Sequence, residues 1–219
     1  MKAHNRVQWV YASSNNDELA SRYDQWSSEY DSDLAEEFGW VGPQRAAEVF
    51  SRHVSKEATV LDAGAGTGLV GRCLANLGYR ALVGIDLSPG MLSEAGAKGV
   101  YDELRQMVLG EPLDFPTDAF DAVISVGVFT VGHAPADALR ELIRITRPGG
   151  HIVFTLRPDV YENAGFKDLQ KSLVSAGHWE LVEMGDEFQT LPKGEPEVYH
   201  RVWVYRVKHE DSHRTGRVV

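Results

Sequence analysis

Three glycines at alternating positions are the most specific chemical signal in the sequence. Gly64, Gly66 and Gly68 follow the apolar stretch TVLDA and precede an apolar helical stripe that begins at Leu69. Glycine permits tight backbone angles and leaves the main chain bare, so a ligand can rest against it beside the free N–H groups of a helix start. The pattern therefore predicts a nucleotide-binding loop between a strand and a helix.

An acidic residue stands where such a loop requires one. Asp86 ends the next apolar stretch, ALVGID, and lies 18 residues after Gly68. A carboxylate at the carboxyl end of the second strand can accept hydrogen bonds from both hydroxyls of a ribose. The glycine pattern alone is a weak signal, but a strand before it, a helix after it and an acid at this distance are three independent conditions. All are met, which predicts an adenosine site at the switch point of a parallel sheet.

The residues around the loop favour a cationic ligand over a dinucleotide. Leu69 stands where the dinucleotide fingerprint has its third glycine. Asp62, just ahead of the loop, would lie close to the negative charge of a pyrophosphate, whereas it suits a ligand that carries an ammonium group. This favours the methionine end of a sulfonium nucleoside. Asp62 can instead cap the amides of the loop itself.

Composition restricts the other functional classes. With 219 residues the chain fits one domain, residues 1–219, and its net charge of −10 would repel a polyphosphate, so nucleic acid is not expected as a partner. The acidity can serve solubility or steer a cationic substrate. No apolar run approaches the roughly 18 residues that span a bilayer, and no secretory signal opens the chain, which predicts a cytoplasmic protein without a membrane partner, monomeric or homodimeric. The single cysteine, Cys73, excludes an internal disulfide, and no metal is expected.

The order of apolar patterns predicts an α/β domain with helices at its start. Two helices fall within residues 14–55, the first opened by the capping-box spacing of Asn15 and Glu18 and the second by Gly42-Pro43. A core over residues 59–207 then alternates short apolar runs with helical stretches, as in a parallel sheet. Its predicted elements include strands near 106–109, 120–126 and 151–156, a helix that starts at Pro135 and a helix over 162–176.

The end of the core departs from this alternation. Two strand-like stretches, near 180–190 and 198–207, are joined by LPKGEPE with no helix between them, which predicts an antiparallel hairpin. Both faces of the last strand are apolar, so we expect it inside the sheet rather than at its edge. Residues 208–219 are polar and lack either period, which predicts a flexible tail.

Several of these stretches together resemble a known family. LDAGAGTG, GIDLSPGML, FDAVISVGVF and RPGGHIVF resemble the motifs of class I methyltransferases, and YDQWSSEYDSDL resembles the methyltransferase-like protein 27 family. The resemblance covers residues 23–207. It implies S-adenosyl-L-methionine as cofactor, with S-adenosyl-L-homocysteine as its product. It also implies a Rossmann-like three-layer α/β/α sandwich, with a seven-stranded mixed sheet in the order 3-2-1-4-5-7-6 and an N-terminal helical lid.

The resemblance assigns a role to each part of the cofactor site. The glycine loop would line the methionine and the ribose, and the acid that ends the second strand would hold the ribose hydroxyls. Two apolar residues after that acid would flank the adenine, and the end of the fourth strand would face the sulfonium. Glu111 or Asp114 would face the adenine amino group, and Glu111, followed by Pro112, is preferred. The positions implied are Gly64, Ala65, Gly66, Asp86, Leu87, Met91, Glu111, Pro112, Ser125, Val126 and Gly127.

Three aromatic residues in the first helix have two interpretations. Tyr23, Trp26 and Tyr30 recur at helical spacing, which is that of a packing face and equally that of a lid that closes over the cofactor. In similar enzymes the second tyrosine of this motif reaches the methionine end of the cofactor. Tyr30 is therefore the preferred cofactor contact.

Candidate catalytic and acceptor-binding residues follow the fourth and fifth strands. Methyl transfer to a small-molecule acceptor needs positioning and desolvation more than a dedicated base. His133 could remove a proton from the acceptor, or it could cap the next helix as an ordinary loop histidine, and His200 on the last strand has the same two interpretations. Arg157 and Tyr161 could bind an anionic acceptor or could be solvated at the surface.

Two other functions stay open. An NAD-dependent oxidoreductase can use a similar sheet, although the glycine spacing and the terminal hairpin disfavour it. A non-catalytic protein that binds S-adenosylmethionine would keep the same fold without turnover.

Overall fold

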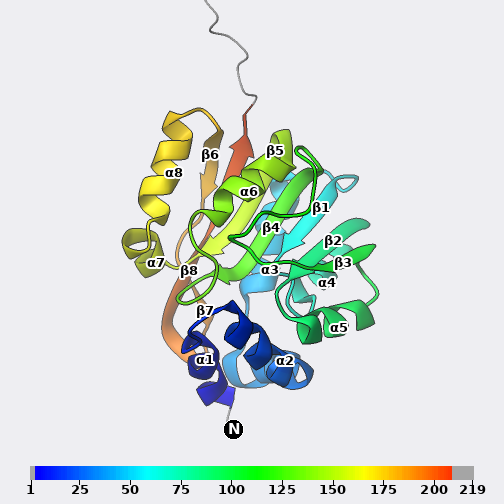
Figure 1. Ribbon diagram of the computed structural model, residues 1–219, viewed down its shortest axis with the longest axis vertical. Helices are drawn as coiled ribbons and strands as arrows, with labels where there is room; N and C mark the ends of the chain where they lie inside the picture. Colours follow the sequence, from blue (N-terminus) through cyan, green and yellow to red (C-terminus); the bar gives the residue numbers. More distant parts are fainter. Residues whose placement is uncertain (1–2, 209–219) are drawn as a thin grey trace, which may run out of the picture.

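The computed structural model describes residues 3–208 (Figure 1). The helices are α1 (Ala3–Tyr11), α2 (Asn16–Asp33), the π-helical turn η1 (Leu34–Phe38), α3 (Gly42–His53), α4 (Leu69–Asn76), α5 (Pro89–Ala97), α6 (Ala138–Ile145), α7 (Pro158–Asn163) and α8 (Phe166–Ser175). The strands are β1 (Thr59–Ala63), β2 (Ala81–Asp86), β3 (Glu103–Gln106), β4 (Phe120–Phe129), β5 (Thr146–Leu156), β6 (Trp179–Met184), β7 (Phe188–Leu191) and β8 (Glu195–Val207).

The sheet has the predicted topology with one strand more than predicted. Its order is β3-β2-β1-β4-β5-β8-β6, and β8 runs antiparallel to both of its neighbours in the sheet, β5 and β6. The Rossmann-like fold and the interior position of the last strand are therefore confirmed. The single strand predicted over 180–190 is wrong, because it ends at Met184 and a separate strand, β7, begins at Phe188. β8 is 13 residues long and extends past β6, so its free end pairs with β7 instead.

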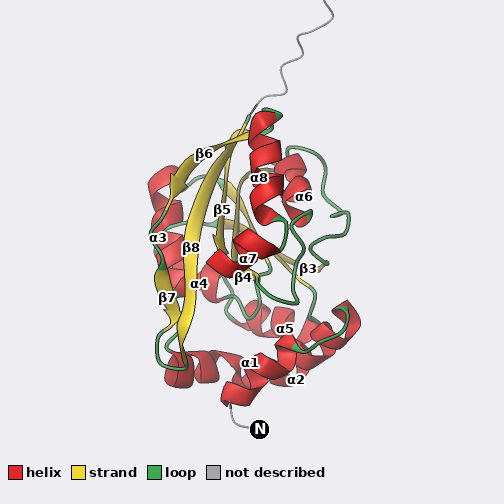
Figure 2. Cartoon of the chain, turned by 90° about the vertical axis from the view of Figure 1, so that its left-hand side faces the viewer, coloured by secondary structure: helices red, strands yellow, loops and turns green. Residues whose placement is uncertain are grey.

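Helices cover both faces of the sheet, as Figure 2 shows. One face packs on α6, α7 and α8 and the other on α3 and α4. Alternation along β8 serves both layers, because Val202 and Val204 join the core under α3 and α4 while Trp203 and Tyr205 join the core under α6 to α8. This burial on two sides explains why the strand is apolar on both faces.

The N-terminal segments form the predicted lid across the carboxyl ends of the parallel strands (Figure 2). Asn15 caps α2 as its spacing indicates, since its side-chain oxygen accepts a hydrogen bond of 2.9 Å from the Glu18 amide. The prediction of only two helices ahead of the sheet is wrong, because α1 precedes them. Val7 and Val10 of α1 are buried in the same cluster as Trp26 of α2. A nine-residue helix depends on such tertiary packing more than on its own sequence, which carried no clear period.

Several predicted element boundaries also change. The helix predicted over 162–176 is divided into α7 and α8 at Gly165, whose φ of +82° is left-handed. The helix predicted from Pro135 begins at Ala138, and the third strand ends at Gln106 rather than near Leu109. Of the predicted flexible tail, residues 208–219, only Lys208 lies within the described residues. Among residues 3–208, no helix is both long enough and apolar enough to cross a membrane.

We predict that Trp179→Ala lowers the free energy of unfolding by about 3–5 kcal/mol, the usual cost of truncating a buried tryptophan. Trp179 is fully buried and stacks on Tyr205 with ring centroids 3.9 Å apart. Val182→Ala on the same strand is the control, because Val182 is 42% exposed and its truncation should change the free energy by no more than about 0.5 kcal/mol. Urea denaturation measures both, and equal losses would contradict the packing described.

Candidate active site

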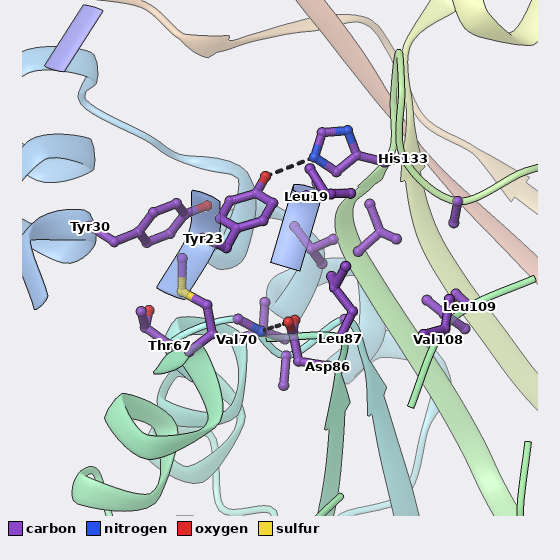
Figure 3. Close-up of a pocket in the computed structure, with 18 of the residues that line it drawn as sticks. Leu19, Tyr23, Tyr30, Thr67, Val70, Asp86, Leu87, Val108, Leu109 and His133 are labelled. Atoms are coloured by element: carbon purple, nitrogen blue, oxygen red, sulfur yellow. Dashed lines mark hydrogen bonds between the residues drawn. The ribbon is translucent and has the colours of Figure 1, made fainter. Parts of the chain in front are cut away.

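A cavity opens where β1, β2 and β4 end beneath α2 (Figure 3). Counted together with the open space at its mouth, it measures about 850 Å³. Its wall combines the glycine loop, the end of β2, the end of β4, the loop after β4 and the inner face of α2. The predicted site residues that line it are Tyr23, Tyr30, Gly64, Ala65, Gly66, Asp86, Leu87, Met91, Val126, Gly127 and His133.

The glycine loop is tied down on one side and bare on the other. The amides of Gly64 and Ala65 both donate to the Ile85 carbonyl of β2, each over 2.9 Å. A Cβ on Gly64 would lie 2.3 Å from Cγ2 of Val128, whereas a Cβ on Gly66 would meet nothing within 4 Å. Both residues have positive φ angles, +83° and +54°, which favour glycine. The loop therefore packs against β4 and exposes its main chain to the cavity.

Asp86 lies directly below this bare main chain. One carboxylate oxygen accepts a hydrogen bond of 2.8 Å from the Gly66 amide, and the other accepts one of 3.0 Å from the Ser88 amide. Burial raises the pKa of Asp86 to about 6, although these two backbone bonds act in the opposite direction. A carboxylate has about four acceptor positions, so two amides leave capacity for further donors. The residues present thus fit a ligand that carries a ribose.

Tyr23 and His133 form a hydrogen-bonded pair inside the cavity (Figure 3). The two side chains meet at 2.8 Å between the phenol oxygen and Nε2, and Nδ1 of His133 lies 2.9 Å from the Val131 carbonyl. A carbonyl only accepts, so Nδ1 carries the proton and Tyr23 donates to Nε2. Burial lowers the pKa of His133 and raises the pKa of Tyr23 well above its usual value. Both groups are therefore uncharged near neutral pH.

Trp26 and Ser125, two of the predicted cofactor contacts, are not among the residues that line the cavity. Trp26 is buried in the lid, where its indole N–H donates to Asp33 over 2.7 Å. Ser125 is fully buried and donates to the Ala63 carbonyl over 2.7 Å, which ties β4 to β1. The two interpretations of the aromatic face of α2 therefore apply to different residues, since Tyr23 and Tyr30 reach the cavity and Trp26 packs in the core.

Asp62, also predicted to contact the cofactor, is fully buried and is not among the residues that line the cavity. The Tyr101 hydroxyl donates to its Oδ2 over 2.6 Å, and its Oδ1 has no hydrogen-bond partner among residues 3–208. Burial raises the pKa of Asp62 to about 7. Gly71 makes this arrangement possible, because a Cβ there would lie 2.3 Å from the Tyr101 hydroxyl. The absence of a side chain at Gly71 therefore lets the Tyr101 hydroxyl reach Asp62.

Glu111 and Pro112, predicted to lie at the adenine, are exposed and are not among the residues that line the cavity. The wall at this position is made by Met107, Val108 and Leu109. β3 ends at Gln106, so these three residues, and not the acid that follows them, occupy the end of the strand. Asp114, the alternative, is also exposed.

The predicted acceptor-binding residues also lie outside the wall of this cavity. Arg157 makes two hydrogen bonds to Asp159, from Nε at 2.9 Å and from Nη2 at 2.7 Å. The Tyr161 ring packs on Trp203 with centroids 4.9 Å apart. His200 is buried, and burial, assisted by the charge of Arg157, lowers its pKa to about 4.

Two acids of α2 that sequence reasoning missed hold the lid over the glycine loop. Asp24 accepts hydrogen bonds from the Ser88 hydroxyl at 2.6 Å and from the Gly90 amide at 2.7 Å, at the start of α5. Asp31 accepts from the Thr67 hydroxyl and forms an ion pair of 2.8 Å with Lys98. Their spacing of two helical turns on the face that carries Tyr23 and Tyr30 was the available signal.

Comparisons with known proteins agree with this geometry. Residues 61–154 match the family described as "Methyltransferase domain". The chain is 37% identical over 166 residues to methyltransferase-like protein 27 of Homo sapiens, which covers 72% of this chain and 66% of that protein. It is 38% identical over 120 residues to the tRNA U34 carboxymethyltransferase of Shewanella baltica strain OS155, covering 52% of this chain and 36% of that protein. The chain thus spans less than two thirds of the length of these curated relatives.

A solved structure, the S-adenosylmethionine dependent methyltransferase from Mesorhizobium loti, has the same fold. It matches with a TM-score of 0.56 at 19% identity, over 75% of this chain and 100% of that chain. The strand order, the bare glycine loop and the buried acid beside it are those expected of the class I methyltransferase fold. The chain resembles the S-adenosyl-L-methionine-dependent methyltransferases of this class and, among them, methyltransferase-like protein 27.

We predict that His133 is observed as the Nδ1-protonated neutral tautomer and titrates below its usual pKa, because burial penalises the charged ring. Long-range ¹H–¹⁵N correlation spectra report both properties. The hydrogen bond from the Tyr23 hydroxyl to Nε2 stabilises only the neutral ring of His133. Tyr23→Phe removes this bond, so the pKa of His133 should rise in this variant. Tyr199→Phe, an exposed tyrosine on β8, should leave the spectrum of His133 unchanged. A wild-type ring protonated on Nε2 instead would refute the pairing.

Proposed function

We propose that this chain transfers a methyl group from S-adenosyl-L-methionine to a small-molecule acceptor held between the end of β4 and the lid. The observation that carries the proposal is the cavity itself. On one side it offers bare main chain at Gly66 above the carboxylate of Asp86, and on the other side the neutral pair of Tyr23 and His133. A nucleoside on one side of the cavity would therefore lie opposite an acceptor on the other.

The residues of the first side are suited to hold the cofactor. Asp86 would accept hydrogen bonds from the ribose hydroxyls, and the main chain from Gly64 to Gly66 would carry the methionine part. Leu87 and Met91 supply apolar surface for the adenine, with Met107 to Leu109 on the opposite wall. When bound, S-adenosyl-L-methionine supplies a methyl group that its sulfonium already activates for displacement. The protein then has to position the acceptor and exclude water.

Tyr23 and His133 can take the proton that an oxygen or nitrogen acceptor must lose. The Nε2 lone pair faces the Tyr23 hydroxyl, so an acceptor that donates to the phenol oxygen reaches His133 through it. Its proton passes to the phenol oxygen as the phenol proton passes to Nε2, which leaves Tyr23 neutral and His133 positively charged. The Nδ1–H bond to Val131 favours the charged ring. His133 is therefore the proposed general base and Tyr23 the group that relays the proton.

The shape and charge of the molecule favour a small acceptor over a polymer. Asp24 and Asp31 hold α2 against the starts of α5 and α4, so the helix covers part of the entrance to the cavity. The net charge of −10 opposes the approach of a nucleic-acid backbone. These two properties support a small metabolite even though one relative is named for its tRNA substrate.

We predict that the intact chain binds S-adenosyl-L-methionine and S-adenosyl-L-homocysteine in isothermal titration calorimetry. Asp86→Ala should weaken binding by about 1–3 kcal/mol, the cost of leaving buried hydrogen-bonding groups unpaired. The control is Asp114→Ala, which removes an exposed acid outside the cavity wall and should bind as the wild type does. Absence of binding by the wild-type chain at millimolar cofactor would refute the function. Binding without formation of S-adenosyl-L-homocysteine across a panel of acceptors would indicate the non-catalytic alternative.

We predict that cofactor affinity decreases as the pH falls through about 6, the pKa to which burial raises Asp86. Ribose hydroxyls donate hydrogen bonds to the ionised carboxylate of Asp86, so binding favours its charged form. Below pH 6 most Asp86 is protonated and must lose that proton before the ribose can bind. Affinity should be constant above about pH 7 and about tenfold weaker at pH 5. Asp86→Asn cannot titrate and should bind more weakly but without this slope. A parallel slope in both proteins would assign the pH dependence to another group.

A further inference from the structure

The side of the cavity that α2 forms carries no charge. Asn16, Leu19, Tyr23 and Tyr30 line the cavity and recur at helical spacing, so they form one stripe along the helix. The same helix contains six acids and one arginine, and none of these charged residues lines the cavity. A helix rich in charge therefore turns an uncharged, partly aromatic stripe toward the place of the acceptor.

The rest of the wall offers no partner to an anionic acceptor. Its one charged side chain is the carboxylate of Asp86, and among residues 3–208 every lysine and arginine lies outside the wall. Arg157, a candidate from the sequence for binding an anionic acceptor, is one of these and pairs with Asp159 instead. An anion in the cavity would lose hydration without gaining a counter-charge, which is unfavourable.

A positively charged acceptor lacks a partner as well. The carboxylate of Asp86 would be engaged by the ribose, as proposed above. The hydroxyls of Tyr23 and Tyr30 stay uncharged near neutral pH, because burial raises the pKa of both phenols. A protonated amine also has no lone pair with which to attack a methyl group. The wall therefore favours an acceptor without charge.

The side chains around the pair of Tyr23 and His133 are suited to an apolar body. Leu19 lies one helical turn before Tyr23, on the side of the cavity that faces His133 (Figure 3). Trp40 also lines the cavity, and its ring meets the Tyr30 ring edge-on with centroids 6.4 Å apart. Leucine and aromatic rings gain free energy by covering apolar surface. The hydrogen-bonding pair thus stands beside surface that favours hydrocarbon.

We propose that the acceptor is an uncharged molecule with an apolar body and a hydroxyl group whose oxygen is methylated. This inference rests on the proposed function and specifies its acceptor. The hydroxyl would donate to the Tyr23 oxygen, which can accept a hydrogen bond while it donates to His133. A C–O bond forms as the C–S bond of the cofactor breaks, and the hydroxyl proton moves through Tyr23 to His133. The positive charge that leaves the sulfur therefore ends on His133, so the net charge of the site is unchanged by the transfer.

The test uses the full chain saturated with S-adenosyl-L-homocysteine, so that the cofactor site is filled before a probe is added. Benzyl alcohol, benzoate and protonated benzylamine share one apolar body and differ in charge, and glycerol supplies hydroxyl groups without an apolar body. Benzyl alcohol should bind in calorimetry and shift the ring signals of His133 in ¹H–¹⁵N spectra. The other three probes should bind at least about tenfold more weakly.

The outcomes separate this inference from the proposed function. If S-adenosyl-L-homocysteine fails to bind, the proposed function fails. If it binds and any of the other three probes binds as tightly as benzyl alcohol, only the inference about the acceptor is overturned. Failure of benzyl alcohol to bind, or binding that leaves the His133 signals unmoved, overturns it too.

Matched variants locate the apolar body. Leu19→Ala should weaken the binding of benzyl alcohol by about tenfold, because it removes apolar surface from the wall. The control is Leu77→Ala, which truncates a leucine that is 39% exposed and outside the wall, and it should have no effect. Trp40→Leu, on a different segment, should also weaken binding and replaces Leu19→Ala if that variant does not fold. Unchanged affinity for S-adenosyl-L-homocysteine shows that a variant is folded, and benzyl alcohol binding unaffected by both wall variants would overturn the proposal.

Discussion

The contact between the Asp86 carboxylate and the Gly66 amide is the constraint on which the rest of the site depends. The parallel register of β1 and β2, with Ala63 beside Ile85, brings the glycine loop and the acid to adjacent strand ends. The Ile85 carbonyl then holds two amides of the loop, which fixes its bare surface toward the cavity. A side chain at Gly64 would collide with Val128 of β4. Loop, acid and three strands thus define one another's positions.

The lid extends the same arrangement to the other wall of the cavity. Asp24 and Asp31 bind groups at the starts of α5 and α4, so the contacts that hold α2 in place are made to the edges of the cofactor site itself. Tyr23 and Tyr30 of this helix line the cavity, while Trp26, which lies between them on the same face, is buried in the cluster that α2 forms with α1 and η1. The position of Tyr23, which we propose as the proton relay, is therefore coupled to the contacts that α2 makes beside the glycine loop.

The alternation of strands and helices was predictable from local patterns, namely apolar runs, glycine after a strand and a cap before a helix. The strand order came from the resemblance to class I methyltransferases, and neither source predicted the directions of the side chains. Asp62 turns toward Tyr101, which is distant in sequence and reaches it only because residue 71 is glycine. Glu111 misses the cavity because β3 ends a few residues early, a matter of register with β2 that no periodicity in a four-residue strand reveals. Likewise α1 exists through its packing, so its own sequence gave little signal.

The two buried acids beside the loop give the site a preference for positive charge. Burial raises the pKa of Asp62 to about 7 and the pKa of Asp86 to about 6. The charge of Asp86 also raises the pKa of Asp62, and the charges of both acids raise the pKa of Tyr101. For an acid whose folded pKa lies above its unfolded value, ionisation costs stability once the pH rises past the unfolded value. Near neutral pH the free chain therefore bears an electrostatic cost that a cationic ligand would offset. A sulfonium with an ammonium group meets that condition, whereas a pyrophosphate would increase the cost.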